Sequence, residues 1–155
     1  MDKDEKGAAV KFPPPLIFGI CIVSGYLLNF ALPLSLTQLP GREYIAVLAV
    51  LLGLVLILGA VVALKRAKTS IEPWKPTSNI VNTGVFALSR NPIYVAFICF
   101  SVAIGLLMNN LWIILFSPVA AVAVFYIAID KEERYLSEKF QREYLDYCAK
   151  VRRWL

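Results

Sequence analysis

The chain has 155 residues, of which 59% are hydrophobic, and its formal net charge is +5. This length suits one domain, and the hydrophobic share exceeds the roughly 45–50% that is usual in soluble domains. The sequence has no histidine and only three scattered cysteines, which excludes histidine metal ligands, Ser-His or Cys-His catalysis and a disulfide framework. We therefore expect an integral membrane protein without a metal ion.

The polar N-terminal residues precede a proline run and a long apolar segment. We expect residues 1–12 to form a disordered tail. Residues 16–36 carry no charge and are long enough to cross a bilayer as a helix. A cleaved signal peptide is the weaker interpretation, because the run is too long and lacks a clear small-x-small cleavage pattern. Pro33 either kinks this helix or ends it.

Three further apolar runs follow, at residues 44–64, 93–108 and 111–129. A bilayer core of about 30 Å needs about 20 apolar residues in a helix, so each run is a candidate transmembrane helix. Asn109 and Asn110 separate the last two runs, which indicates a tight helical hairpin. The sequence thus predicts an all-α integral membrane fold with four transmembrane helices, in which residues 13–155 form one domain.

The basic residues are distributed unevenly along this arrangement. If the chain crosses four times, 15 of the 16 Lys and Arg residues fall on one side of the membrane. The positive-inside rule then places both termini and the second loop in the cytoplasm, and we expect a protein of the bacterial inner membrane. Topology and anionic lipid explain the net charge, so no nucleic-acid partner is expected.

Two polar segments, the second loop and the C-terminal tail, flank the hairpin. The loop, 65–92, is rich in proline, asparagine and glycine, which predicts an ordered but irregular cytoplasmic loop with Trp74 at the membrane interface. In the tail, 130–155, apolar residues recur every three or four positions: Leu136, Phe140, Tyr144, Cys148 and Val151. This spacing indicates an amphipathic C-terminal helix, or two short ones. Both segments lie on one membrane face and are expected to meet there.

The border between the loop and the third apolar run holds the first candidate site. Asn91 and Pro92 are typical of a helix start, with Asn91 as the cap and Pro92 in the first turn. The N–H groups of that turn, together with Arg90, would bind a carboxylate or phosphate. Tyr94 could offer a hydroxyl at headgroup depth. The plain alternative is a topological arginine, a helix cap and an interfacial tyrosine.

Adjacent carboxylates, Glu132 and Glu133, follow the fourth apolar run. At a membrane face they are costly unless a cationic or hydrogen-bonding group meets them. A ligand with an ammonium group, a sulfonium centre or ribose hydroxyls would do so, and the alternative is a solvated helix face paired with nearby basic residues. The basic and aromatic ending, 151–155, is either an interfacial anchor or a segment that folds back to close the site.

The order of these features resembles a known superfamily. The run GVFALSRNPIYV, the hairpin and EERYLSEKFQREYLDYCAKVRRWL resemble the isoprenylcysteine carboxyl methyltransferases and phospholipid methyltransferases, particularly the small bacterial members. The resemblance covers residues 69–155. It implies an S-adenosylmethionine-dependent methyltransferase that acts at the cytoplasmic membrane face on a small lipophilic or lipid acceptor, whose reacting group is a carboxylate, thiol or amine. Methyl transfer is then a direct displacement, for which the protein supplies position and a dry site.

The resemblance also implies individual roles. Arg90 and Glu133 are the expected catalytic residues. The expected cofactor-binding residues are Gly84, Asn91, Pro92, Tyr94, Glu132 and Glu133, and the expected substrate-binding residues are Trp74, Tyr144, Tyr147, Arg152 and Arg153. Asn91 stands where the family usually has histidine, so a role that needs an imidazole is in doubt. Gln141 replaces the glycine that usually follows the phenylalanine of the tail, which predicts that the tail helix continues through it.

Two other functions stay open. Membrane sterol reductases share an Arg-His-Pro-x-Tyr stretch and a tyrosine-rich basic tail, and they use NADPH. The short chain and the pair Glu132 and Glu133 favour the methyltransferase. The second alternative is a non-catalytic membrane protein whose loop binds lipid headgroups or a partner.

Overall fold

The computed structural model describes residues 7–36 and 39–155, and in these ranges it contains helices and no strands. Residues 1–6 of the predicted disordered tail lie outside the described residues. The helices are α1 (Pro14–Ala31), α2 (Arg42–Arg66), the short 3₁₀-helix η2 (Gly84–Ala87), α3 (Pro92–Leu107), α4 (Leu111–Val124), the π-helical η3 (Phe125–Ile129), α5 (Asp130–Phe140) and α6 (Arg142–Lys150). The predicted all-α fold is thus confirmed for the described part of the chain.

Helices of membrane-spanning length dominate the structure. Among the described residues, α1, α2 and the continuous helical stretch from Leu111 to Phe140 are long and apolar enough to cross a bilayer. The remaining apolar helix, α3, has 16 residues. At 1.5 Å per residue it rises about 24 Å, less than a core of about 30 Å. The chain is therefore an integral membrane protein, and a four-span arrangement requires the shorter α3 to cross as well.

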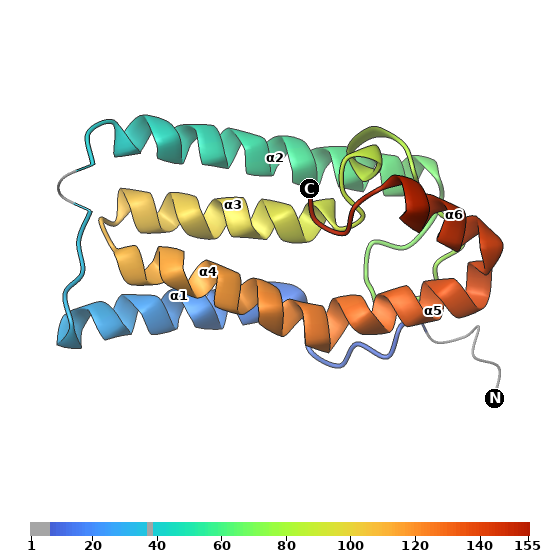
Figure 1. Ribbon diagram of the computed structural model, residues 1–155, viewed down its shortest axis with the longest axis horizontal. Helices are drawn as coiled ribbons and strands as arrows, with labels where there is room; N and C mark the ends of the chain where they lie inside the picture. Colours follow the sequence, from blue (N-terminus) through green and yellow to red (C-terminus); the bar gives the residue numbers. More distant parts are fainter. Residues whose placement is uncertain (1–6, 37–38) are drawn as a thin grey trace.

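The apolar helices lie side by side along their lengths (Figure 1). Helix α2 packs against α3, α3 against α4, and α4 against α1. Small side chains are buried where α2 meets α3, as with Ala46 and Ala103, whereas Leu48 and Leu58 of α2 are more than 60% exposed. Small residues inside and large apolar residues outside are typical of helices that pack in lipid.

The first helix is shorter than the apolar run that predicted it. Helix α1 ends at Ala31, so Pro33 follows the helix and does not kink it. The extended chain after α1 is hydrogen-bonded to the end of the bundle where α3 and α4 meet. The Leu36 N–H donates to Asn109 Oδ1 at 2.7 Å, and the Trp112 Nε1–H donates to the Leu32 carbonyl at 2.7 Å. The prediction of a helix through residue 36 is therefore wrong in its last turn.

The predicted hairpin between α3 and α4 is confirmed. Asn109 has a positive φ of 53°, a conformation that asparagine tolerates better than most residues. The next residue, Asn110, caps α4, since its side-chain oxygen accepts a hydrogen bond from the Ile113 N–H at 3.3 Å. These two asparagines reverse the chain without an intervening loop.

The tail differs from the prediction of a continuing helix. The fourth apolar helix runs through η3 directly into α5 and ends only at Phe140. The chain then breaks at Gln141, whose φ of 46° and ψ of −116° lie outside the helical region. Absence of glycine therefore did not prevent the break. The tail forms two amphipathic helices, α5 and α6, and α6 folds back towards the second loop (Figure 1).

The N-terminal segment before α1 packs against the second loop. The Gly7 N–H donates to the Trp74 carbonyl at 3.2 Å, and the side chains of Ala8 and Val10 are buried. The prediction of a disordered tail therefore does not hold for residues 7–12. A segment with small apolar residues can be ordered when a neighbouring loop offers both a backbone acceptor and an apolar surface.

Replacement of Gly25 by alanine should destabilise the contact between α1 and α4. A Cβ on Gly25 would lie 2.8 Å from the Ile113 nitrogen, in the backbone of α4, whereas a Cβ on Gly19 in the same helix meets nothing within 4 Å. Both changes improve helix propensity by about 1 kcal/mol, so any difference in stability between the two variants comes from packing. We expect Gly25→Ala to lower the free energy of unfolding by about 1–3 kcal/mol relative to Gly19→Ala. Thermal unfolding in detergent measures this, and equal midpoints for the two variants would refute the close helix contact.

Candidate functional site

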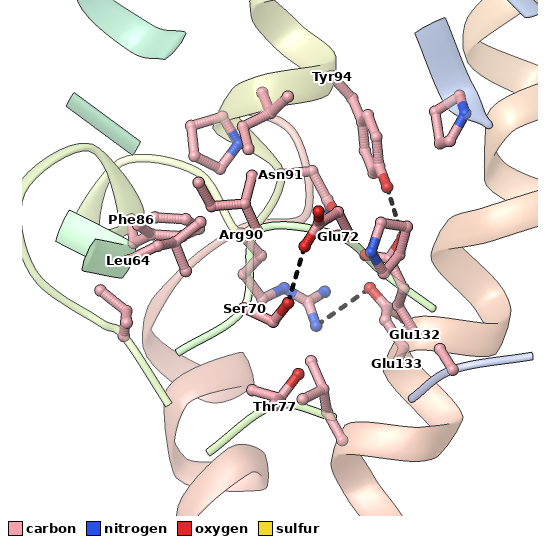
Figure 2. Close-up of a pocket in the computed structure, with 18 of the residues that line it drawn as sticks. Leu64, Ser70, Glu72, Thr77, Phe86, Arg90, Asn91, Tyr94, Glu132 and Glu133 are labelled. Atoms are coloured by element: carbon pink, nitrogen blue, oxygen red, sulfur yellow. Dashed lines mark hydrogen bonds and ion pairs between the residues drawn. The ribbon is translucent and has the colours of Figure 1, made fainter. Parts of the chain in front are cut away.

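A cavity of about 350 Å³ lies at the end of the bundle where the second loop, the start of α3, α5 and α6 meet. This volume is within the roughly 300–1,000 Å³ of small-molecule sites. Apolar side chains from the membrane helices form one wall, among them Ile57 and Val61 of α2 and Phe97 of α3. Further apolar residues and a smaller set of polar side chains from the loop, α3 and α5 form the remainder (Figure 2). The cavity is therefore mainly apolar, with a few polar and charged side chains in its wall.

The charged side chains that line this cavity, within the described chain, are Glu72, Glu132, Glu133 and Arg90. Three carboxylates thus face one guanidinium. Glu133 is paired with Arg90 and Arg153, and the partly exposed Glu72 is paired with Lys75. Among the described residues no basic side chain pairs with Glu132, so a cationic group of a ligand would be favoured beside it.

The two predicted halves of the site meet through Tyr94 and Glu132. The Tyr94 hydroxyl donates to Glu132 Oε1 at 2.5 Å, which joins the start of α3 to the start of α5. Tyr94 is 7% exposed, and both side chains line the cavity. The hydrogen bond leaves the second oxygen of the Glu132 carboxylate for another donor.

Glu133 is held by two arginines. Arg153 binds it in a bidentate manner, with Nε 2.8 Å from Oε1 and Nη2 2.8 Å from Oε2. Arg90 Nη1 lies 3.3 Å from the same Oε1. The hydrogen bonds to Glu133 raise the pKa of Arg153 above its usual value. The two guanidinium groups contact both carboxylate oxygens of Glu133 and fix its orientation.

Arg90 contacts α6 and the C-terminal segment that follows it. Its backbone N–H donates to the Arg152 carbonyl at 3.0 Å, and Nη1 donates to Cys148 Sγ at 2.6 Å. The side chain is 12% exposed. Among the described residues, Arg90 Nε is the buried side-chain polar atom without a hydrogen-bond partner. An unpaired buried donor beside a ligand cavity indicates that a bound molecule or water completes the site.

The start of α3 differs from the predicted anion site. Asn91 precedes Pro92 as expected, but its side chain does not cap the helix and instead donates from Nδ2 to the Arg153 carbonyl at 3.0 Å. The N–H groups of Tyr94 and Val95 donate to the Asn91 carbonyl. Since Pro92 has no N–H, at most one backbone N–H of this turn is available to bind a ligand. Asn91 thus orients the tail, a task for which a neutral amide suffices.

Aromatic side chains complete the cavity. Tyr144 and Tyr147 of α6 line it and are buried, and the Tyr147 hydroxyl donates to the Phe86 carbonyl at 2.7 Å. Burial raises the pKa of both tyrosines above the usual value, so both hydroxyls are neutral at physiological pH. Trp74 lines the cavity from the second loop and is 44% exposed.

Three predicted site residues lie outside the cavity lining. Gly84, with a φ of 61°, lines a separate hollow between the end of α2 and residues 80–84. Arg152 is exposed and contributes its backbone carbonyl to the Arg90 N–H. Arg153 acts through Glu133, and its guanidinium lies 4.9 Å from the Phe125 ring centroid. Direct contact of these three residues with a ligand is therefore not supported by their positions.

The second loop supplies lining residues that sequence reasoning missed, notably Ser70, Glu72 and Thr77. The Thr77 N–H donates to the Tyr135 hydroxyl at 3.2 Å and ties the loop to α5. One signal was present in the sequence, since Glu72 is the only acidic residue in 65–92. A single acidic residue in a strongly basic loop indicates a local structural or binding role for that residue.

Comparison with known proteins gives one match. The family model described as phospholipid methyltransferase matches residues 42–143, well over half of the chain. No curated protein and no solved structure matches the chain. The matched range extends from the start of α2 into α6. It leaves out Tyr144, Tyr147 and Arg153, which the structure brings to the cavity or to Glu133.

Removal of the Arg153 side chain should release the C-terminal segment. Arg153→Ala deletes both hydrogen bonds to Glu133 and the contact with Phe125, whereas Arg152→Ala removes an exposed side chain next to it. We expect Arg153→Ala to lower the free energy of unfolding by about 1–3 kcal/mol and Arg152→Ala to change it by less than about 0.5 kcal/mol. Hydrogen exchange of residues 142–155 checks this. Equal protection in the two variants would contradict the role assigned to the ion pair.

Proposed function

The chain belongs to the phospholipid methyltransferase family, and we propose that it transfers a methyl group from S-adenosylmethionine to a lipophilic acceptor at the cytoplasmic face of the membrane. The observation that carries this proposal is the cavity in which Tyr94 and Glu132 meet beside the paired residues Arg90 and Glu133. It lies where the polar segments adjoin the apolar bundle, so water-borne and membrane-borne reactants can meet there.

The lining residues fit this cofactor. S-adenosylmethionine carries a sulfonium, an ammonium, ribose hydroxyls and a carboxylate. Glu132 and Glu133 suit the cationic and hydroxyl groups, and Arg90, with its unpaired Nε, suits the carboxylate. We assign Glu132 to the ammonium or ribose, because one of its oxygens is already held by Tyr94. Tyr94, Asn91 and Pro92 then act from the α3 side of the cavity.

The bound cofactor supplies a methyl group already activated by its sulfonium, so the chain need not form a covalent intermediate. Its own residues bind, orient and exclude water. Glu133 and Arg90 form a fixed charged wall, because each is held by the other and by the tail. We propose that this pair positions the reacting groups without exchanging protons.

The acceptor site is proposed on the apolar side of the same cavity. Ile57, Val61 and Leu64 of α2 line it together with Phe97 of α3, and both helices are apolar, with α2 long enough to cross a membrane. An acyl or isoprenoid chain would lie along them, with its reacting group directed towards Trp74, Tyr144 and Tyr147. An acceptor of this kind would enter sideways from the membrane.

The proposed orientation of the chain in the membrane is inferred from the distribution of its basic residues. We infer that α3 crosses together with α1, α2 and the stretch from Leu111, which gives four spans, cytoplasmic termini and placement in the bacterial inner membrane. The polar cavity residues then lie on the same side as nearly all Lys and Arg residues.

The charge of the cavity weighs against the reductase alternative. NADPH carries phosphate groups that need cationic partners, whereas three of the four charged lining residues in the described chain are acidic. The acidic lining thus supports the methyltransferase over an NADPH-dependent enzyme.

Replacement of Glu132 by glutamine should weaken cofactor binding. The change keeps the size of the side chain but replaces one oxygen of the cavity-lining carboxyl group by an amide donor, while Glu143→Gln makes the same change on the exposed face of α6. We expect the Kd for S-adenosylhomocysteine, measured by calorimetry in detergent, to rise about tenfold or more for Glu132→Gln and to stay unchanged for Glu143→Gln.

The wild-type protein decides between the functions in the same assay. Binding of NADPH without binding of S-adenosylhomocysteine would favour the reductase, and binding of neither would favour a non-catalytic membrane protein.

A further inference from the structure

Glu72 is a cavity residue to which neither the resemblance nor the family match assigns a role. It lies in the second loop, and both of its carboxylate oxygens are held: Ser70 Oγ donates to Oε2 at 3.2 Å and Lys75 Nζ donates to Oε1 at 2.9 Å. Figure 2 shows Glu72 and Ser70 with the hydrogen bond between them, among the side chains around the cavity. The Lys75 hydrogen bond lowers the pKa of Glu72, which keeps the carboxylate ionised.

The loop around Glu72 is fixed at several points. The Lys75 N–H donates to the Glu72 carbonyl at 3.1 Å and closes the turn. The Ser78 N–H donates to Thr69 Oγ1 at 2.9 Å, and the Thr77 N–H reaches Tyr135 on α5. An irregular segment with this many hydrogen bonds presents its side chains in a defined position. Glu72 is therefore a fixed part of the cavity wall.

The N-terminal segment holds the same turn from outside. The Gly7 N–H donates to the Trp74 carbonyl, and a Cβ on Gly7 would overlap the backbone of Lys75. Ala8, next to it, lines the cavity. Only glycine allows this approach, so the segment from Gly7 to Val10 clamps the turn that carries Glu72.

The charges around Glu72 are only partly balanced. Its partner Lys75 is 56% exposed and Glu72 is 41% exposed, and an exposed ion pair of this kind contributes little energy. Lys75 is not among the lining residues, so its ammonium compensates the carboxylate from outside the cavity. Inside the cavity Arg90 is engaged by Glu133. Glu72 can therefore bind a cationic group of a ligand without breaking a strong contact.

We propose that Glu72 is a third acidic ligand-binding residue, which recognises a cationic group of the cofactor, and that Gly7 is a positioning residue for it. The proposal rests on the proposed use of S-adenosylmethionine. It adds the loop and the N-terminal segment, 7–10, to a site otherwise built by α3, α5 and α6. The segment 7–10 lies outside the range 42–143 that matches the family model.

Calorimetry with S-adenosylmethionine and S-adenosylhomocysteine tests the role of Glu72. We expect Glu72→Gln to raise the Kd of at least one of them about fivefold. Weaker binding of both ligands would show that the Glu72 carboxylate contacts the ammonium group, which both ligands carry. Weaker binding of S-adenosylmethionine alone would show that it contacts the sulfonium. Lys75→Gln removes the opposite charge of the same pair, and we expect unchanged or tighter binding.

The outcomes separate this inference from the proposed function. If wild type binds both ligands and Glu72→Gln does not change either Kd, the role of Glu72 is overturned while the cofactor stands. Equal losses in Glu72→Gln and Lys75→Gln would show that the ion pair only stabilises the loop, which also overturns the role. If wild type binds neither ligand, the proposed function fails and this inference fails with it.

A second pair of variants tests the role of Gly7. Gly7→Val should displace the segment 7–10 from the turn that carries Glu72 and raise the Kd for the same ligand that Glu72→Gln affects. Ala9→Val adds bulk at an exposed position of the same segment and should have no effect. Unchanged binding in Gly7→Val, or equal losses in both valine variants, would overturn the positioning role.

Discussion

The ion pair between Arg153 and Glu133 is the contact on which the site depends. It joins the C-terminal segment to α5, and Glu133 also contacts Arg90, two residues before the start of α3. Both carboxylate oxygens of Glu133 are bound, and Glu133 is 19% exposed, so the interaction is stronger than an ordinary surface ion pair. It holds the segment that follows α6 against α5, beside the cavity. The tail therefore completes the fold and the site together.

Around this contact the fold separates two environments. The apolar helices pack through small residues and expose large apolar ones, which suits lipid on their outer faces. At one end of the bundle the polar segments converge, and three glutamates are among the residues that line the cavity there. This arrangement explains why the polar residues are concentrated in two short segments. A lipophilic acceptor and a charged cofactor can share one cavity only where these environments meet.

Much of this arrangement could be predicted from the sequence, because long apolar runs and charge asymmetry have few structural solutions. The meeting of Tyr94 with Glu132 followed from a hairpin that returns the chain to the same end. Other features depend on contacts that no local pattern reveals. The Asn91 amide finds its partner 62 residues away, and Gln141 breaks a helix in a conformation that glycine would normally adopt. The place of Glu72 was hidden because irregular loops have no periodicity to interpret.

An assay of methyl transfer decides whether the protein methylates a lipophilic acceptor. Purified protein in vesicles of bacterial lipid would be incubated with S-adenosylmethionine that carries an isotopic label on its methyl group, and the organic-soluble fraction would be analysed by mass spectrometry. We expect a labelled lipophilic product that forms with wild type and is strongly reduced when Tyr94→Phe removes the hydroxyl that holds Glu132. If bound cofactor yields no labelled product with any lipid extract, the chain binds the cofactor without transferring its methyl group to a lipophilic acceptor, and the proposed function is wrong.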